Sequence, residues 1–207
     1  MGAGGGGGVP VSASREGSAP VRQQILVSGL GGQGVLFLTR LLADAAIRRG
    51  VPVLTSETHG MAQRGGVVVS HLKAGDFSSP LIRASRADGL LLLSEENLAA
   101  HRGFLRPGGW MVVNGCSTPE GPRAHLLDAD GLAREAGNPQ GANLVLLGFA
   151  LGRLGTVGGG GGLYCSAGDV RAALEARVGT AEHLLGASLA ALDLGFRRGT
   201  GDHCPPC

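Results

Sequence analysis

One arrangement near the amino terminus constrains the fold more than any other feature of the chain. The apolar run Ile25-Leu26-Val27 is stopped by Gly29, and residues 35–49 then carry apolar side chains at helical spacing. Gly50 follows at the position where a left-handed residue commonly closes a helix, and residues 51–54 have the pattern of a second strand. This order predicts a strand, a glycine turn, a helix and a strand, which together form a β-α-β unit.

The remainder of the domain continues the alternation of strands and helices. Further strands are predicted at residues 67–72, 89–93 and 110–114, with a weaker candidate at 123–127. Helices are predicted at residues 98–102 and 143–154, at 166–178 behind a capping box of Ser166 and Asp169, and from a cap at Thr180 to residue 196. The alternation predicts an α/β fold, a Rossmann-like three-layer domain whose mostly parallel sheet has helices on both faces.

Composition sets the boundaries of this domain. Residues 1–23 are rich in Gly, Ser, Pro and Ala and are predicted to be a disordered tail, whereas residues 24–198 form the domain. Residues 155–162 hold six glycines and are predicted to be a loop. Residues 199–207 are predicted to be a flexible tail, because the C-x-x-C spacing of Cys204 and Cys207 has too few neighbouring ligands for a zinc site.

Charge and cysteine content exclude several classes of function. The chain has 18 basic and 16 acidic residues without a block of like charge, so we expect no nucleic-acid partner and no membrane surface. No apolar run reaches the length of about 18 residues that a membrane span needs. Four cysteines without a secretory signal favour reduced thiols and a cytoplasmic location.

The glycine turn itself matches the dinucleotide-binding pattern through Gly29, Gly31 and Gly34. With 39 glycines in the chain such a match arises by chance, but this one stands between a strand and a helix, as the pattern requires. Free amides and the helix dipole would favour an anion there. Three interpretations remain: an NAD(P) cofactor with Glu57 as the ribose-binding acid, another anion such as phosphate or carboxylate, and glycines that serve helix packing alone.

A second dense stretch, residues 57–66, joins two predicted strands. Arg64 is its strongest candidate, since a guanidinium suits carboxylate or phosphate; the alternative is an ion pair with Glu57. His59 could bind substrate or be a hydrogen-bonded bystander, and Gln63 could orient its neighbours. The chain shows no nucleophile with base and orienter, no metal-spaced cysteine cluster and no acidic pair suited to magnesium, so this stretch resembles part of an active site.

The glycine turn and residues 57–66 together resemble the gamma-type domain of 2-oxoacid:ferredoxin oxidoreductases. The form of residues 59–66, with Ser70-His71 after it, is most similar to the beta subunits of indolepyruvate ferredoxin oxidoreductases, and residues 138–143 also resemble that group. The resemblance covers residues 24–198. The glycine tract at 158–162 and both tails depart from the family pattern and leave the substrate open.

The resemblance implies a cytoplasmic, two-subunit enzyme that decarboxylates an aryl 2-oxoacid oxidatively to its acyl-CoA and reduces ferredoxin. It implies that the large alpha subunit carries thiamine diphosphate, Mg and [4Fe-4S] clusters, that coenzyme A is the co-substrate, and that this chain binds no cofactor alone. No residue is expected to be catalytic. The candidates for a site facing the substrate, coenzyme A or the partner are Gly31, Gly32, Gln33, Gly34, Glu57, His59, Gln63, Arg64, Gly65 and Gly66. The open alternatives are a stand-alone NAD(P)-binding oxidoreductase and a structural adaptor.

Overall fold

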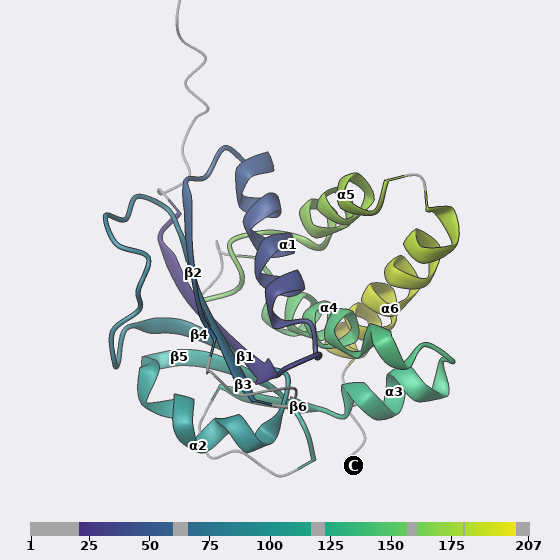
Figure 1. Cartoon of the computed structure of the whole chain (residues 1–207), viewed down its shortest axis with the longest axis horizontal. Helices are drawn as coiled ribbons and strands as arrows, with labels where there is room; N and C mark the ends of the chain where they lie inside the picture. The colour runs from purple at the N-terminus through teal and green to yellow at the C-terminus, as the bar shows by residue number, and fades with distance from the viewer. Residues whose placement is uncertain (1–20, 60–65, 117–122, 157–160, 180, 202–207) are drawn as a thin grey trace, which may run out of the picture.

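The computed structural model describes residues 21–59, 66–116, 123–156, 161–179 and 181–201 (Figure 1). Within these residues one sheet has the strand order β2-β3-β1-β4-β5-β6. β3 is antiparallel to β1 and to β2, and the other neighbouring pairs are parallel, so the prediction of a mostly parallel sheet is confirmed. The strands are β1 (Gln23–Leu30), β2 (Val53–His59), β3 (Val67–Ala74), β4 (Ala87–Leu92), β5 (Leu105–Asn114) and β6 (Ala124–Leu127).

Helices cover the two faces of the sheet unequally, as Figure 1 shows. The long helices α1, α4, α5 and α6 lie on one side together with α3, whereas in the described part of the chain the other side has only the short α2 between two 3-10 turns. The α-helices are α1 (Val35–Arg48), α2 (Leu98–His101), α3 (Ala129–Glu135), α4 (Ala142–Leu154), α5 (Ala167–Val178) and α6 (Glu182–Thr200). The 3-10 turns are η1 (Glu95–Asn97), η2 (Arg102–Phe104) and η3 (Pro139–Gly141).

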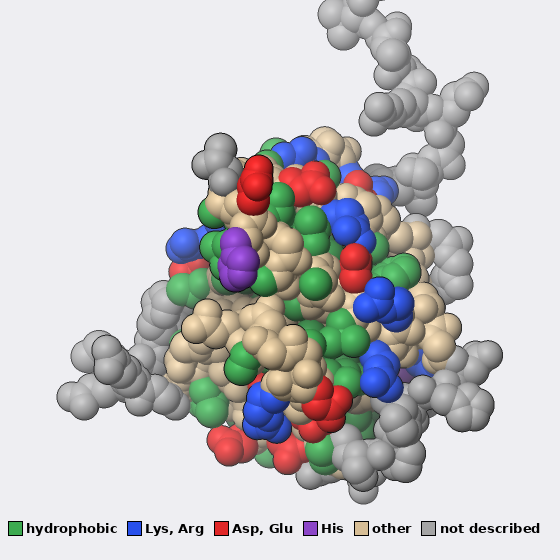
Figure 2. Space-filling view, turned by 90° about the vertical axis from the view of Figure 1, so that its right-hand side faces the viewer, with side chains coloured by type: hydrophobic (Ala, Val, Ile, Leu, Met, Phe, Trp, Pro, Cys, Tyr) green, Lys and Arg blue, Asp and Glu red, His purple; other side chains and the backbone are tan. Residues whose placement is uncertain are grey.

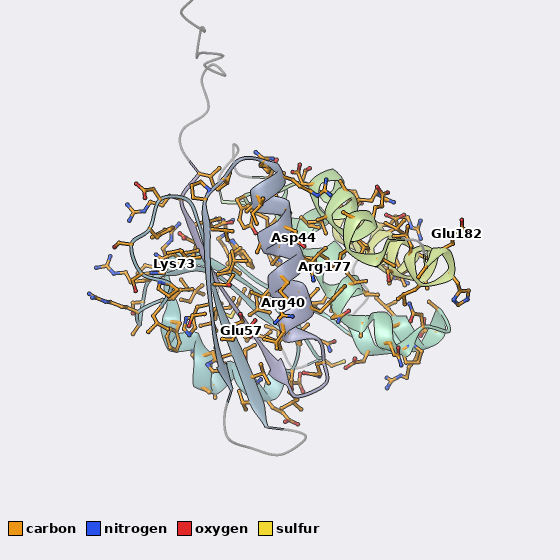
Figure 3. The ribbon with its side chains drawn as sticks, turned by 45° about the horizontal axis from the view of Figure 1, so that its top comes forward. Arg40, Asp44, Glu57, Lys73, Arg177 and Glu182 are labelled. Carbon is orange, nitrogen blue, oxygen red and sulfur yellow. The ribbon has the colours of Figure 1, made fainter. Side chains whose placement is uncertain are left out.

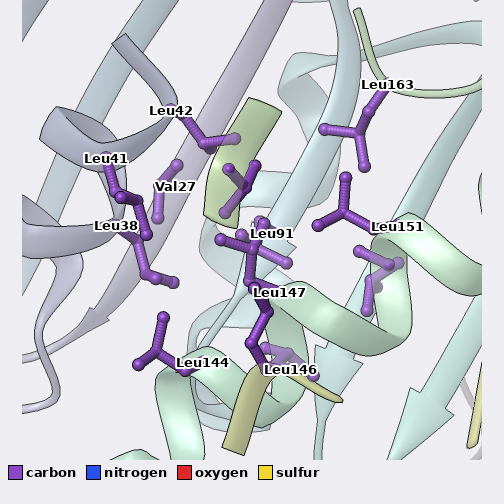
Figure 4. Packing of buried hydrophobic residues seen from close by; sticks show 14 of the residues in the cluster. Val27, Leu38, Leu41, Leu42, Leu91, Leu144, Leu146, Leu147, Leu151 and Leu163 are labelled. Carbon is purple, nitrogen blue, oxygen red and sulfur yellow. The ribbon is translucent and has the colours of Figure 1, made fainter. Parts of the chain in front are cut away.

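The central strand β1 explains how one short apolar run serves both faces. Side chains alternate along a strand, so Ile25 and Val27 enter the larger core under α1 and α4, while Leu26 enters the smaller core on the α2 side. All three are fully buried. Leucines of α1 and α4 fill the larger core against them (Figure 4). The sequence pattern therefore accounts directly for α1, which has one apolar face, and for β1, which is apolar on both faces.

Two predicted helix ends are confirmed by their hydrogen bonds. Gly50 is left-handed, with φ of 69°, and its amide donates to the carbonyl of Ile47 while the next amide donates to that of Ala46. At the start of α5, the Ser166 hydroxyl and the Asp169 carboxylate cap each other's backbone amides, which is the predicted capping box. Local sequence was sufficient in both cases because each motif closes within a few residues.

Glycines set the distance between α4 and α6. A Cβ at Gly148 would overlap the carbonyl of Leu192, and one at Gly195 would overlap that of Val145. Gly152 and Gly199 repeat the contact one turn further along. The two helix backbones therefore pack more closely than larger side chains permit. This contact extends α6 to Thr200, beyond the predicted end at residue 196, and places Gly199 and Thr200 in the helix instead of a tail.

Other differences from the sequence predictions have similar tertiary causes. Gln23, assigned to the amino-terminal tail, begins β1 and binds Gly162 and Tyr164 through its side-chain amide. The predicted β-α-β unit is present, but β3 lies between β1 and β2 and runs antiparallel to both. The expected cap Thr180, residues 157–160 of the glycine loop and the Cys204 to Cys207 segment lie outside the described residues; α6 begins after Ala181.

Candidate functional site

The glycine turn after β1 is closed largely by its own residues. The Gln33 side-chain Oε1 accepts a hydrogen bond from the Leu30 amide at 2.7 Å, and the Gln33 amide donates to the Leu30 carbonyl at 3.1 Å. The Gly31 amide donates to the Gly66 carbonyl at 2.9 Å, so the turn contacts the end of the polar stretch that precedes β3. Gln33, predicted as a candidate site residue, thus holds the turn with its side chain.

Asn143, at the start of α4, holds the turn from the other side. Its Nδ2 donates to the Gln33 carbonyl at 3.2 Å, and its Oδ1 accepts from the Leu144 amide at 2.7 Å. Gly34 is left-handed, with φ of 84°, and a Cβ there would overlap Nδ2 of Asn143. Glycine is therefore required at Gly34 both for its backbone conformation and for the close approach of α4.

A pocket of about 270 Å³ opens beside this turn. It lies at the carboxyl ends of β1, β4 and β5. In open α/β sheets, ligands bind at this edge, between adjacent strands whose connections lead to opposite sides of the sheet. Among the described residues none accepts a hydrogen bond from the amides of Gly32 and Gly34, at the positive end of α1. The residues that line the pocket are Gly32, Gln33, Leu93, Asn114, Asp130, Pro139, Gln140, Ala142 and Asn143.

Asn114 and Asp130 form the wall opposite the turn. Asn114 ends β5 and is buried; its Nδ2 donates to the Leu93 carbonyl at 3.1 Å and to the Asp130 carboxylate at 2.9 Å, and its Oδ1 accepts from the Ala129 amide. The Asp130 carboxylate on this wall would repel a negatively charged ligand group in the pocket. The pocket therefore combines amide donors with an acidic acceptor, a mixture that suits a ligand with both hydrogen-bond donors and acceptors better than a bare phosphate.

An apolar groove of about 230 Å³ adjoins the pocket. Gln140 and Asn143 line both spaces, while Phe37 of α1, Leu144 of α4 and Leu184 of α6 contribute the apolar walls of the groove. Leu184 is exposed, and the face of the molecule made by α3, α5 and α6 mixes such apolar side chains with both signs of charge (Figure 2). A ligand or chain segment with a polar end and an apolar body matches this pair of spaces.

The structure places only part of the predicted polar stretch. Glu57 lies within β2, and its carboxylate is 3.7 Å from the Arg40 guanidinium of α1 (Figure 3). His59 ends β2 and Gly66 precedes β3, and these two strands are antiparallel neighbours in the sheet. Gln63, Arg64 and Gly65 lie outside the described residues. Among the described residues of the stretch 57–66, Gly66 is therefore the one that forms a hydrogen bond with the glycine turn.

Glu57 does not stand where a ribose-binding acid would. Since β3 separates β2 from β1, two strand spacings, about 10 Å, lie between its strand and the glycine turn. The sequence placed Glu57 just past the second predicted strand, where a ribose-binding acid is expected, and it did not single out Asn114 and Asp130. The signal was present in the predicted strand that ends at Asn114, because the carboxyl ends of parallel strands share one edge of the sheet.

The described cysteines do not form a cluster site. Burial raises the pKa of the Cys165 thiol to about 12, so this side chain disfavours the thiolate form that iron-sulfur ligation requires. Cys116 is exposed, and within the described ranges no three His, Cys, Asp or Glu side chains are grouped to hold a metal ion. In the same part of the chain no helix is both long and apolar enough to cross a membrane.

An open α/β sheet with a glycine turn and a pocket at its strand ends is the architecture of a ligand-binding α/β domain. Residues 24–198 match the family model described as "Pyruvate ferredoxin/flavodoxin oxidoreductase", and the chain belongs to this family. The resemblance drawn from the two sequence motifs is thereby confirmed.

Relatives with assigned names agree with this membership. The chain is 33% identical over 155 residues to "Indolepyruvate oxidoreductase subunit IorB" of Archaeoglobus fulgidus, a match that covers 64% of this chain and 77% of the relative. It is 30% identical over 149 residues to the protein of the same name in Thermococcus kodakarensis, covering 60% and 74%. Oxidoreductase subunits are therefore among the relatives that this chain matches over most of their length.

A solved structure gives the same fold. The gamma subunit of a keto/oxoacid ferredoxin oxidoreductase from Geobacter sulfurreducens superimposes with a TM-score of 0.68 at 25% identity, covering 86% of this chain and 98% of that one. The pyruvate oxidoreductase subunit PORC of Thermotoga maritima, at 22% identity, has the same fold with a TM-score of 0.68, covering 85% and 96%. The α/β class predicted from the sequence is the class of both structures.

Proposed function

We propose that this chain is the small subunit of a 2-oxoacid:ferredoxin oxidoreductase of the indolepyruvate type. The observation that carries the proposal is the family match over residues 24–198, together with the identity of 33% to a named indolepyruvate oxidoreductase subunit. The complex would decarboxylate an aryl 2-oxoacid oxidatively, form the acyl-CoA and pass electrons to ferredoxin in the cytoplasm. A large alpha subunit would be the obligate partner.

The cofactors of the reaction would belong to that partner. An iron-sulfur cluster needs thiolate ligands, and the buried Cys165, whose pKa is about 12, does not fit this role. We assign thiamine diphosphate, Mg and the [4Fe-4S] clusters to the large subunit, as the membership of this chain in the oxidoreductase family suggests. When bound there, the cofactors supply the carbanion and electron-transfer chemistry.

This chain would contribute binding and orientation at the edge of the shared site. The pocket beside Gly32, with the Asp130 carboxylate on its far wall, offers both donors and an acceptor to coenzyme A or to the partner. The adjoining groove at Phe37 and Leu184 would receive an apolar segment. Arg64, which lies outside the described residues, remains the candidate for binding a carboxylate or phosphate on the substrate side.

The test compares the chain alone with the assembled complex. We expect indolepyruvate- and CoA-dependent reduction of viologen only when both subunits are present, and activity of this chain alone would contradict the proposal. Phenylpyruvate and pyruvate serve as alternative substrates, because the family match leaves the 2-oxoacid open. Assembly is checked first by size-exclusion chromatography, so that loss of activity is not confused with loss of the complex.

Single variants then separate a site role from an adaptor role. Arg64→Ala should lower turnover of the intact complex, and Asp130→Asn should raise the KM for CoA more than it lowers kcat. Arg48→Ala, an exposed arginine on α1, is the matched control. Unchanged kinetics in both variants of an assembled complex would favour the purely structural adaptor.

A stand-alone NAD(P)-binding oxidoreductase is the alternative. The glycine turn favours it, whereas the acidic wall of the pocket and the separation of Glu57 from the turn by β3 oppose it. Calorimetric titration of the full chain with NAD and NADP decides the matter: binding of either would support the alternative, and its absence would remove it.

A further inference from the structure

The loop between β3 and β4, residues 75–86, lies at the end of the sheet opposite the pocket (Figure 1). It is a long connection without regular structure of its own, and such loops in compact domains commonly serve binding. Three contacts fix it in place. The Gly75 amide donates to the Pro52 carbonyl at 2.7 Å, the Ile82 amide to Nδ1 of His71 at 3.2 Å, and the Ser85 amide to the Gly103 carbonyl at 2.9 Å.

Cations gather around Phe77 of this loop. The Arg22 guanidinium is 4.6 Å and the Lys73 ammonium 5.1 Å from the centre of the Phe77 ring, and Arg83 is close enough to repel the ammonium. Lys73 is the only lysine of the chain and is 7% exposed. Figure 3 places it on the side of the sheet away from Arg40 and Asp44 of α1.

No described carboxylate neutralises these three side chains. The ion pairs among the described residues involve other cations. Asp88 is paired with Arg106 at 2.6 Å and accepts a hydrogen bond from the Gln24 amide. Asp76, in the loop itself, forms no ion pair with another described residue. Burial and the like charges of Arg83 and Arg22 lower the pKa of Lys73, so its environment disfavours the charge that it carries at neutral pH.

The same loop also exposes an apolar side chain and stores backbone strain. Leu81 is 52% exposed, although its neighbour Ile82 is buried in the core on the α2 side. Ser85 has φ of 58°, a left-handed conformation that is strained for a non-glycine residue. A held loop with unpaired cations around an aromatic ring, beside an exposed leucine, has the composition of a binding surface for an acidic and partly apolar partner.

We propose that Arg22, Lys73, Phe77, Leu81 and Arg83 form a docking surface for an acidic segment of a partner polypeptide. Carboxylates of that segment would pair with the exposed Arg22 and Arg83 beside the buried Lys73, and one of its apolar side chains would cover Leu81. Binding would relieve the repulsion between the cations that the isolated chain retains. The surface is independent of the pocket, since it lies beyond the opposite ends of the same strands.

The experiment uses the full chain and a fluorescent peptide of glutamate and leucine. We expect saturable binding that weakens at least about tenfold between low salt and about 0.3 M salt, because the contacts are exposed charges. The double variant Arg22→Gln/Arg83→Gln should bind about tenfold more weakly. The matched control Arg48→Gln/Arg134→Gln removes two exposed arginines on α1 and α3 and should bind as the parent does.

Three outcomes would overturn the proposal. The acidic peptide does not bind, or a peptide of lysine and leucine binds as well, or both double variants lose affinity equally. Inorganic sulfate provides a further arm: if it binds to the same residues as tightly as the peptide, the surface is a small-anion site and not a docking surface. Leu81→Ser, a surface change that spares the fold, should weaken the peptide while leaving sulfate binding unchanged.

Discussion

The two ends of the sheet handle polar side chains in opposite ways. At the carboxyl ends of the parallel strands, Gln33, Asn114 and Asn143 each form hydrogen bonds with backbone groups, so they shape the pocket. At the other end, Lys73, Arg22 and Arg83 form no ion pair with another described residue. Polar groups that are hydrogen-bonded within the fold fix the shape of the pocket, whereas cations without an ion pair can still gain energy by pairing with another molecule. The predictions below test this contrast.

The largest effect is expected from Gly34→Ala at the pocket end. The substitution imposes a Cβ on a left-handed residue and drives it into Asn143, so we expect a loss of about 2–3 kcal/mol in the free energy of unfolding. Urea denaturation measures it. Gly32→Ala is the matched control, because Gly32 is also left-handed but has open space around it; equal losses in the two variants would show that the contact with Asn143 is unimportant.

Asn143→Ala should cost about 1–2 kcal/mol, because it leaves the Gln33 carbonyl without its donor and removes the contact between α4 and the turn. A double-mutant cycle of Asn143→Ala with Gly34→Ala measures the coupling between the two positions. The loss from Gly34→Ala should shrink when position 143 is alanine, since the clash is then relieved. Strict additivity of the two losses would contradict the packing described for this end of the sheet.

On the Lys73 side, the stability of the chain should depend on pH through His101. Both ring nitrogens of His101 are buried and have no hydrogen-bond partner among the described residues, and burial lowers the pKa of this side chain below 6.5. His71, which faces the same Phe104 ring, also has a lowered pKa because of burial, Lys73 and His101. The unfolded chain then binds more protons than the folded one, so stability is lost as pH falls below about 6.5.

His101→Leu tests this assignment. It should stabilise the protein by about 1 kcal/mol at neutral pH, because it removes two unsatisfied polar atoms, and it should make the loss of stability on acidification less steep. Melting temperatures between pH 7.5 and pH 5, with the exposed His183→Leu as control, provide the measurement. A pH dependence equal to that of the parent would assign the effect to other groups.

The smallest effect is expected from Lys73→Met, which keeps the buried stem and removes the charge. Relief of repulsion and of burial should outweigh the lost contact with Phe77, so the isolated chain should gain about 0.5 kcal/mol at low salt. The same variant should bind the acidic peptide more weakly. A loss of stability together with unchanged peptide binding would place Lys73 in the core of the fold and outside the docking surface.

Local motifs accounted for much of this fold. The strand of Ile25 to Val27, the close of α1 at Gly50 and the capping box of Ser166 were all predicted, because each depends on residues within a turn or two of the chain. The antiparallel direction of β3 was not predicted, because the pattern of apolar residues is the same in a parallel and in an antiparallel strand. The close contact of α4 with α6 was not predicted either, because glycine has a low helix propensity and its sequence position does not indicate helix packing.

The sequence by itself determined the α/β class, the glycine turn and the family, because hydrophobic period and short motifs are local properties. Only the tertiary structure decided which polar side chains meet. It placed Asn114 and Asp130 opposite the turn, separated Glu57 from that turn by a strand, brought Arg22 and Lys73 to the ring of Phe77, and set Arg83 near Lys73. These residues come from distant segments, and the order and direction of strands bring them together, which no local pattern encodes.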